Sequence, residues 1–116
     1  MKRTLNLNKQ ERLDILTDAI ETNAIQYWAC NYGAILIWRT DDLTIAKAEF
    51  YADNAKDKKI FYRLTHALIQ TGINRVLDPA FQVRDDIRAS ILEKDNDSES
   101  CDVIIQAALF GEILYG

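Results

Sequence analysis

His66 is the only histidine in the sequence, and histidine is the side chain that most readily transfers a proton near neutral pH. Thr65 precedes it and Asp85 and Asp86 lie further along the chain, so a carboxylate-assisted general base is one chemistry that these residue types could perform. No serine or cysteine is identifiable as a nucleophile that His66 would activate. We therefore interpret His66 as a structural or solvent-facing residue and predict that the protein is not an enzyme.

Two adjacent carboxylate pairs, Asp41-Asp42 and Asp85-Asp86, could bind magnesium or calcium, because these ions take several oxygen ligands. Adjacent side chains usually diverge, however, and neither pair has the spacing or the central glycine of a calcium-binding loop. We expect the first pair to form a turn and the second to place negative charge at the start of a helix. The sequence thus predicts no metal and no cofactor.

Cys30 and Cys101 are the two cysteines, and no further pair completes a set of zinc ligands. The two could form one disulfide. Two distant cysteines in a chain without a secretion signal are more often reduced, buried thiols, which is the interpretation we favour.

Carboxylates are concentrated between Glu93 and Asp102, where five of them accompany a single lysine. Such a segment could attract a basic partner, or it could be a solvated loop. The net charge of -4 and the pI of about 4.9 disfavour broad binding to phosphates. If the protein contacts a partner through acidic groups, the candidate residues are Asp41, Asp42, Asp95, Asp97 and Glu99.

Basic and aromatic residues alternate in one segment only, from Lys56 to Arg63. This composition is typical of surfaces that bind single-stranded nucleic acid, although lysines on a strand edge also discourage aggregation. The alternative function is therefore a nucleic-acid-binding accessory protein. Its candidate residues are Lys56, Lys58, Lys59, Tyr62 and Arg63.

Four further aromatic residues, Tyr27, Trp28, Tyr32 and Trp38, fall within one short region. Aromatic side chains on strands usually belong to the core, whereas exposed ones are favoured anchors for binding. The pattern allows both interpretations.

The length of 116 residues and the hydrophobic fraction of 48% predict a single compact domain, residues 1–116. The first residues are too few and too polar to form an export signal, and no apolar run reaches the length of a membrane span. We therefore expect a protein of the cytoplasm of the host cell that does not enter the membrane.

The hydrophobic pattern predicts a helix over residues 8–22, started by a capping box formed by Asn8 and Glu11. Residues 25–38 are rich in aromatic and branched side chains and predict a strand, with Gly33 as a bulge or bend. Residues 44–51 predict a half-buried strand, because Lys47, Glu49 and Tyr51 alternate with the apolar Ala46, Ala48 and Phe50. Residues 59–63 predict a third strand, and the short connections favour an antiparallel meander.

Helices are predicted for residues 66–77 and 83–94, and residues 102–116 read as one mostly apolar final helix. Gly111 inside that helix predicts a close backbone crossing, and Glu112 either finds a buried donor or faces solvent. The fold class is α+β: an N-terminal helix, a three-stranded antiparallel meander, then three helices, of which the C-terminal one forms the core. An apolar final helix could also pair with a second copy, so a homodimer is an open alternative.

The Tyr27-Trp28-Ala29 segment, the helix start at Leu64-Thr65 and the ending from Asp102 to Gly116 resemble an uncharacterised family of small phage, prophage and mobile-element proteins. The ending, with Ala108-Leu109-Phe110-Gly111-Glu112, carries most of this resemblance. It implies a genetic setting and no catalytic residues. Proteins of this size and acidity in that setting suggest a non-enzymatic accessory protein that binds a host protein or nucleoprotein complex, such as an anti-CRISPR or other anti-defence inhibitor.

Overall fold

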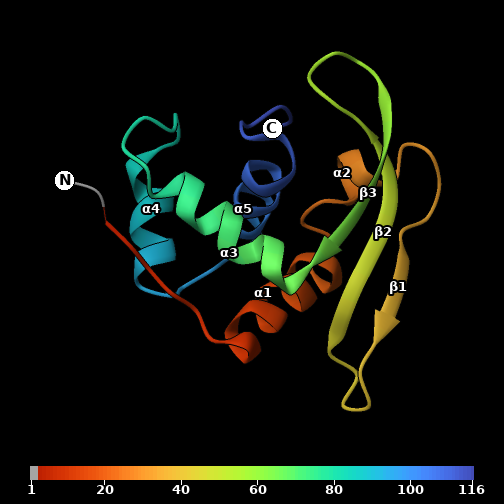
Figure 1. Ribbon diagram of the computed structural model, residues 1–116, viewed down its shortest axis with the longest axis horizontal. Coiled ribbons are helices and arrows are strands. Elements are labelled where there is room, and N and C mark those ends of the chain that lie inside the picture. The colour runs from red at the N-terminus through yellow and green to blue at the C-terminus, as the bar shows by residue number, and fades with distance from the viewer. Residues whose placement is uncertain (1–2) are drawn as a thin grey trace.

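Helices cover one face of a three-stranded sheet in the computed structural model, which describes residues 3–116 (Figure 1). This arrangement confirms the predicted α+β class, with its N-terminal helix, its antiparallel sheet and its C-terminal helix. None of the helices in residues 3–116 is long and apolar enough to cross a membrane. In chain order the elements are α1 (Lys9–Glu21), α2 (Gln26–Ala29), β1 (Leu36–Arg39), β2 (Ile45–Asp53), β3 (Lys59–Thr65), α3 (His66–Val76), α4 (Asp85–Leu92) and α5 (Ser98–Phe110).

Helix α1 begins with the predicted capping box. The Asn8 side chain accepts from the Glu11 amide at 2.8 Å, and the Glu11 carboxylate accepts from the Asn8 amide at 3.0 Å. These two bonds satisfy amides that have no partner within the helix. The apolar side of the helix is buried as its periodicity requires, through Leu13, Ile15, Leu16, Ala19 and Ile20.

The sheet is a meander in the order β1-β2-β3, with both neighbouring pairs antiparallel. Because side chains alternate between faces, residues opposite each other in the register share a face. Ala48, Phe50 and Ala52 of β2 are buried under the helices, whereas Lys47 and Tyr51 point the other way. The alternation predicted for this strand is confirmed.

The prediction of a strand over residues 25–38 is wrong for most of its length. The segment forms the single turn α2, and the chain becomes extended only at β1. Gln26 donates to the carbonyl of Ile20 at the end of α1 at 2.7 Å, and the fully buried Trp28 donates through Nε1 to Asp102 at 2.9 Å. These long-range contacts outweigh the local preference of aromatic residues for strands.

Helix α5 is enclosed as predicted, but it ends at Phe110, where Gly111 adopts a left-handed φ of 74°. The helix predicted for residues 102–116 therefore ends too late, and it also starts too late, because α5 begins at Ser98. Gly111 is a C-terminal cap and not a crossing point, because its missing side chain permits this conformation. The close crossing lies at Gly72 of α3, where an added Cβ would overlap the carbonyl oxygen of Ile104 in α5.

The last residues fold back as an irregular tail onto the core. The Oε1 atom of the fully buried Gln106 accepts from the amides of Leu114 and Tyr115, both at 2.9 Å. Tyr115 stacks on Trp28 with ring centroids 5.4 Å apart. Of the two environments considered for Glu112, the structure shows exposure to solvent.

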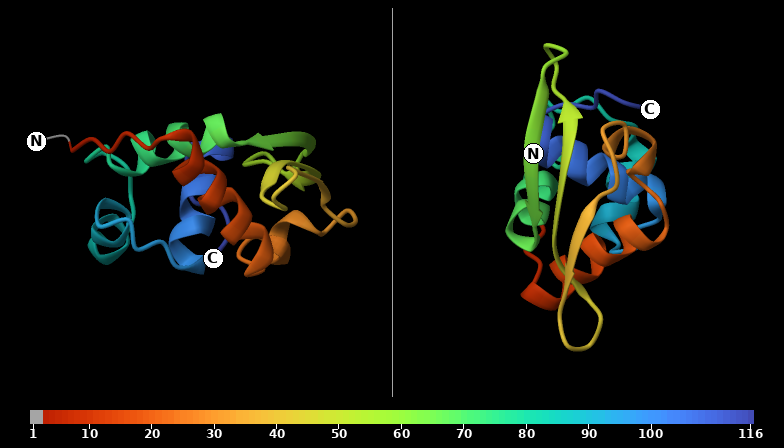
Figure 2. Two further views of the ribbon diagram at one scale, coloured as in Figure 1. Left: turned by 90° about the horizontal axis from the view of Figure 1, so that it is seen from below. Right: turned by 90° about the vertical axis from the view of Figure 1, so that its right-hand side faces the viewer.

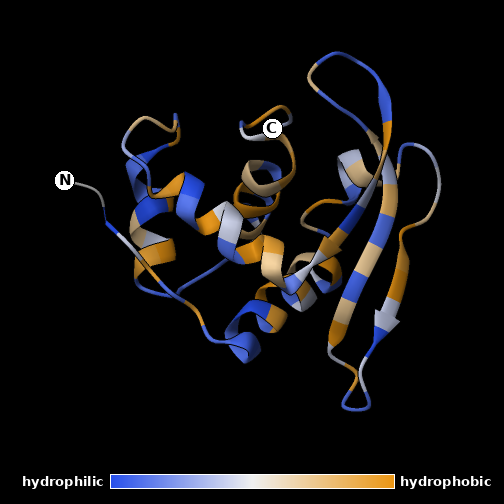
Figure 3. Ribbon diagram, in the orientation of Figure 1, coloured by the Kyte–Doolittle hydropathy of each residue, from blue (hydrophilic) through white to orange (hydrophobic). Residues whose placement is uncertain are grey.

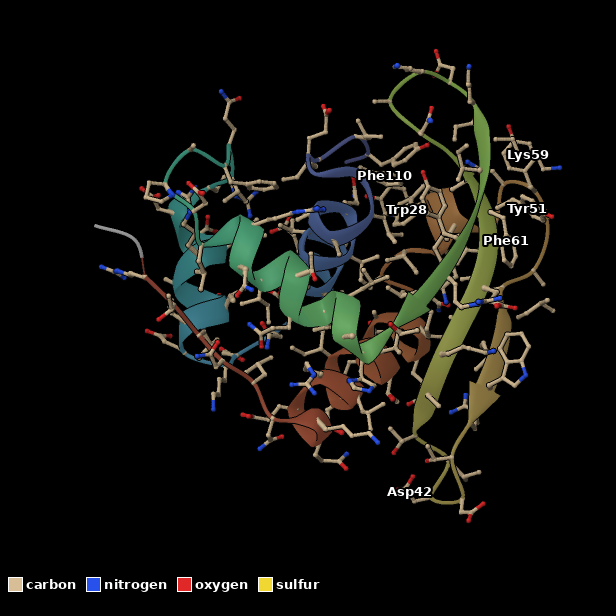
Figure 4. The ribbon with its side chains drawn as sticks, viewed as in Figure 1. Trp28, Asp42, Tyr51, Lys59, Phe61 and Phe110 are labelled. Carbon is tan, nitrogen blue, oxygen red and sulfur yellow. The ribbon has the colours of Figure 1, made fainter. Side chains whose placement is uncertain are left out.

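Aromatic rings fill the space between the sheet and α5. Trp28 meets Phe50 and Phe110 edge to face, at 5.6 and 5.4 Å between centroids. Figure 4 shows Trp28 and Phe110 on the helical side of the sheet, while Tyr51 and Phe61 project from the other side. The covered face therefore holds the core, and the second face is left without a helix in residues 3–116.

Candidate functional site

The face of the sheet that is turned away from the helices lies open in the described part of the chain (Figure 2). We call this surface the outer face. The strand register places on it Leu36, Trp38, Lys47, Glu49, Tyr51, Asp53, Lys59, Phe61 and Arg63.

Large apolar side chains are exposed mainly on the sheet. Trp38, Tyr51 and Phe61 of the outer face retain 41%, 45% and 44% of their accessible surface, and Leu36 retains 58%. Tyr51 and Phe61 are cross-strand neighbours with ring centroids 5.2 Å apart. Exposed apolar side chains that adjoin one another mark a contact surface more strongly than isolated ones do.

Lysines lie over aromatic rings on the outer face and over Tyr32, which precedes β1. The Lys47 Nζ atom is 4.3 Å from the centre of the Trp38 ring, and the Lys59 Nζ atom lies 4.8 and 4.7 Å from the Tyr32 and Tyr51 rings. Such cation–π contacts stabilise by about 0.5–1 kcal/mol at exposed sites. They hold the rings and the charges in one defined pattern.

Glu49 is the least exposed charged group of the outer face, with 8% of its surface accessible. Its Oε2 atom accepts from Arg63 Nε at 2.5 Å and lies 4.0 Å from Lys47 Nζ. The carboxylate thus offsets part of the positive charge on the outer face. The outer face is consequently characterised mainly by its aromatic side chains and carries only a small positive charge.

The structure divides the predicted nucleic-acid-binding residues between two faces. Lys59 and Arg63 belong to the outer face, and Lys56 and Lys58 are exposed in the connection between β2 and β3. Tyr62 points to the covered face, where its ring lies 6.1 Å from Phe50 and 5.4 Å from Phe110. Tyr62 is therefore separated by the sheet from Lys59 and Arg63, although it lines a hollow together with Lys56.

Two of the predicted acidic contact residues, Asp41 and Asp42, lie in the turn between β1 and β2 (Figure 4). Asp42 accepts from the Thr40 hydroxyl and from the Thr44 amide, the latter at 3.2 Å. The hydrogen bond from Thr40, followed by those from Thr44, lowers the pKa of Asp42 below its ordinary value. Asp42 thus helps to build the turn, as the sequence indicated.

Of the other three acidic residues, Asp95 and Asp97 lie in the connection from α4 to α5, and Glu99 lies in the first turn of α5. Asp97 caps α5 by accepting from the Ser100 amide at 2.8 Å, and Glu99 forms an ion pair with Arg84. Asp95 lines a hollow beside Asp14 and Asp18 of α1.

The five acidic residues do not form one surface. Asp41 and Asp42 line a separate hollow beside Lys9 and Gln10, so α1 stands between the two groups. Burial, followed by the charges of Asp14 and Glu21, raises the pKa of Asp18. Local negative charge therefore exists along α1, outside the set predicted from the sequence.

His66 lies beside Arg12, whose Nε donates to His66 Nδ1 at 3.2 Å. Burial, followed by the positive charges of Arg12 and Lys9, lowers the pKa of His66. Asp85 and Asp86 instead form ion pairs with Arg88 and Arg84.

No hydrogen bond joins His66 to a carboxylate in residues 3–116, and no group of three His, Cys, Asp or Glu residues in that range could hold a metal ion. The outer face is therefore the candidate site, because it combines exposed aromatic rings with charged side chains.

No protein-family model matches this chain, and neither the search of curated proteins nor the search of solved structures finds a match. Function must accordingly be argued from the geometry of the outer face.

Proposed function

We propose that this chain is a non-enzymatic binding protein that contacts a partner protein through the outer face of its sheet. The observation that carries this proposal is the exposure of the Tyr51–Phe61 pair, and of Trp38 further along the sheet, on a face that no helix covers in residues 3–116. Aromatic residues and arginine are enriched at the centres of protein interfaces, and a few of them supply most of the binding energy. Arg63 beside Phe61 fits that composition.

A protein partner is favoured over single-stranded nucleic acid, because lysines already cover aromatic rings and Glu49 already pairs with basic side chains. Lys59 and Lys47 lie over aromatic rings, and bases would need those ring faces for stacking. Glu49 is paired with Arg63 and close to Lys47, which reduces the charge available to phosphates. The overall charge of -4 further opposes approach to nucleic acid.

The resemblance to small phage and mobile-element proteins supports a specific setting for this binding. The partner would be a host defence complex in the cytoplasm, and the protein would act as an inhibitor of the anti-CRISPR type. In this proposal the outer face replaces the acidic residues as the main contact, because the acidic set is divided between two places.

The test is capture of a purified defence complex by the immobilised protein, comparing wild type with a Tyr51→Ala/Phe61→Ala variant. Loss of an anchoring aromatic residue costs 2 kcal/mol or more at an interface, so we expect affinity to fall by about 30-fold or more. The matched control is Ile113→Ala, because Ile113 is 36% exposed but lies in the tail. Equal capture by all three proteins would refute the proposal.

Nucleic acid bound along β3 and the connection that precedes it is the second candidate, favoured by the lysines at positions 56, 58 and 59 and by Arg63. Its test is retention of single-stranded DNA by the wild-type protein at low salt. Retention that disappears on Lys56→Glu/Lys58→Glu substitution would support this function, and no retention at low salt would remove it.

A further inference from the structure

Strand β1 has a free edge. Within residues 3–116 it pairs with β2 alone, and all four of its residues are exposed. Leu36, Ile37 and Trp38 make this edge apolar on both faces, and Figure 3 shows apolar colour along the first part of the strand. The unpaired edge of such a strand presents free amide and carbonyl groups beside hydrophobic side chains, which favours pairing with another strand.

Charged side chains protect the opposite edge of the sheet, whereas the only charged residue of β1 is Arg39 at its end. Strand β3 carries Lys59 and Arg63, and charged side chains on an edge discourage pairing. From Leu36 to Trp38 there is neither charge nor proline, and the irregularity in the ladder comes only after Trp38. Pairing is therefore expected at one edge of the sheet.

We propose that β1 pairs antiparallel with β1 of a second copy, forming a two-fold dimer with a continuous six-stranded sheet. Because only the β1 edge takes part, the contact is isologous and closes at two chains instead of extending into a filament. Each chain would then present its outer face on the same side of the joined sheet. The dimer does not depend on the identity of the partner that the outer face binds.

The sequence of β1 selects one register for this contact. Pairing centred on Ile37 places Ile37 against Ile37 of the second copy and Leu36 against its Trp38, so every contact of these three residues is apolar on both faces. A shift that centres the pairing on Trp38 sets Arg39 against Ile37 of the other copy. A one-residue slip would bring the covered face of one copy to the outer side of the other.

The experiment is sedimentation equilibrium over a concentration series with wild type, Ile37→Lys and Ile37→Glu. Position 37 meets itself across the two-fold axis, so each variant opposes like charges. We expect dimer affinity to fall by about 100-fold or more in each variant alone. An equimolar mixture of the two should restore a dimer, because lysine then faces glutamate.

The control is Ile60→Lys, because Ile60 is exposed to 37%, close to the 39% of Ile37, but lies on β3 at the other edge. This control should dimerise as wild type does. A wild-type protein that is monomeric throughout the series, or a mixture of the position-37 variants that stays monomeric, would overturn the proposal. Loss of partner capture in Tyr51→Ala/Phe61→Ala with the dimer retained would separate the two proposals.

Discussion

Cys101 shows how burial controls a single reactive group in this protein. Its side chain is fully buried at the start of α5, and burial, followed by the charges of Asp18, Asp97 and Asp102, raises the pKa of the thiol to about 12. The folded chain therefore keeps the proton that the unfolded chain releases near the ordinary value of 9.0. Stability should in consequence fall as the pH rises above that value.

We expect one fast-reacting thiol in the native protein at pH 8. Cys30 is partly exposed, whereas Cys101 is buried and its raised pKa keeps the thiol protonated at pH 8. Reaction with a chromogenic disulfide should therefore modify Cys30 quickly and Cys101 only after addition of denaturant. The Cys30→Ser variant should show no fast phase, and a fast phase in that variant would contradict the assigned burial of Cys101.

At the residue scale, the alternation of side chains along a strand predicts the position of Tyr62 as well as that of the β2 residues. The opposition of Lys47 and Tyr51 to Ala48 and Phe50 followed from period two and is confirmed. The same rule places Tyr62 on the opposite face from Lys59 and Arg63, so the sequence already held the signal that Tyr62 belongs to the core. That the lysines lie over aromatic rings could not be predicted, because it depends on neighbours from other strands.

At the element scale, the crossing of α3 and α5 depends on the absence of one side chain. Gly72 is buried, and an added Cβ would overlap the Ile104 carbonyl, which belongs to the backbone and cannot rotate away. We expect Gly72→Ala to lower the free energy of unfolding by about 3 kcal/mol, despite the higher helix propensity of alanine.

Urea unfolding would measure this loss as a lower transition midpoint. Asn74→Ala is the control, since Asn74 is exposed on the same helix and loses only the hydrogen bond from Gln70, which should change stability by no more than about 1 kcal/mol. A Gly72→Ala protein as stable as wild type would mean that the two helices can move apart freely.

The elements that the sequence predicted poorly are those built by distant contacts. Helix α1 and strand β2 have capping and periodic signals within their own residues, and both are confirmed. Helix α2 and the tail instead depend on each other: Tyr115 stacks on Trp28, and Gln106 binds the tail amides. Local propensity carries no information about such pairs, so the apolar residues at the end of the chain predict one continuous helix.

At the scale of the whole molecule, the exposed aromatic rings and the carboxylates along α1 lie in different places. The outer face is aromatic with lysine and arginine, whereas Asp14, Asp18 and Asp95 gather beside α1. A partner that docks on the outer face would gain mostly from apolar burial, which salt does not weaken. A partner attracted to the carboxylates would be released as salt screens the charges. The two modes of binding can therefore be told apart.

We expect a triple variant, Asp41→Asn/Asp95→Asn/Glu99→Gln, to bind the partner complex within about twofold of wild type at all salt concentrations, because none of the three carboxylates lies on the outer face. Asp42 and Asp97 stay unchanged, since they build a turn and cap α5. Surface plasmon resonance at low and high salt would measure affinity and association rate together. A triple variant that loses the partner, with wild-type binding that also disappears at high salt, would assign function to the carboxylates and remove the outer face from the mechanism.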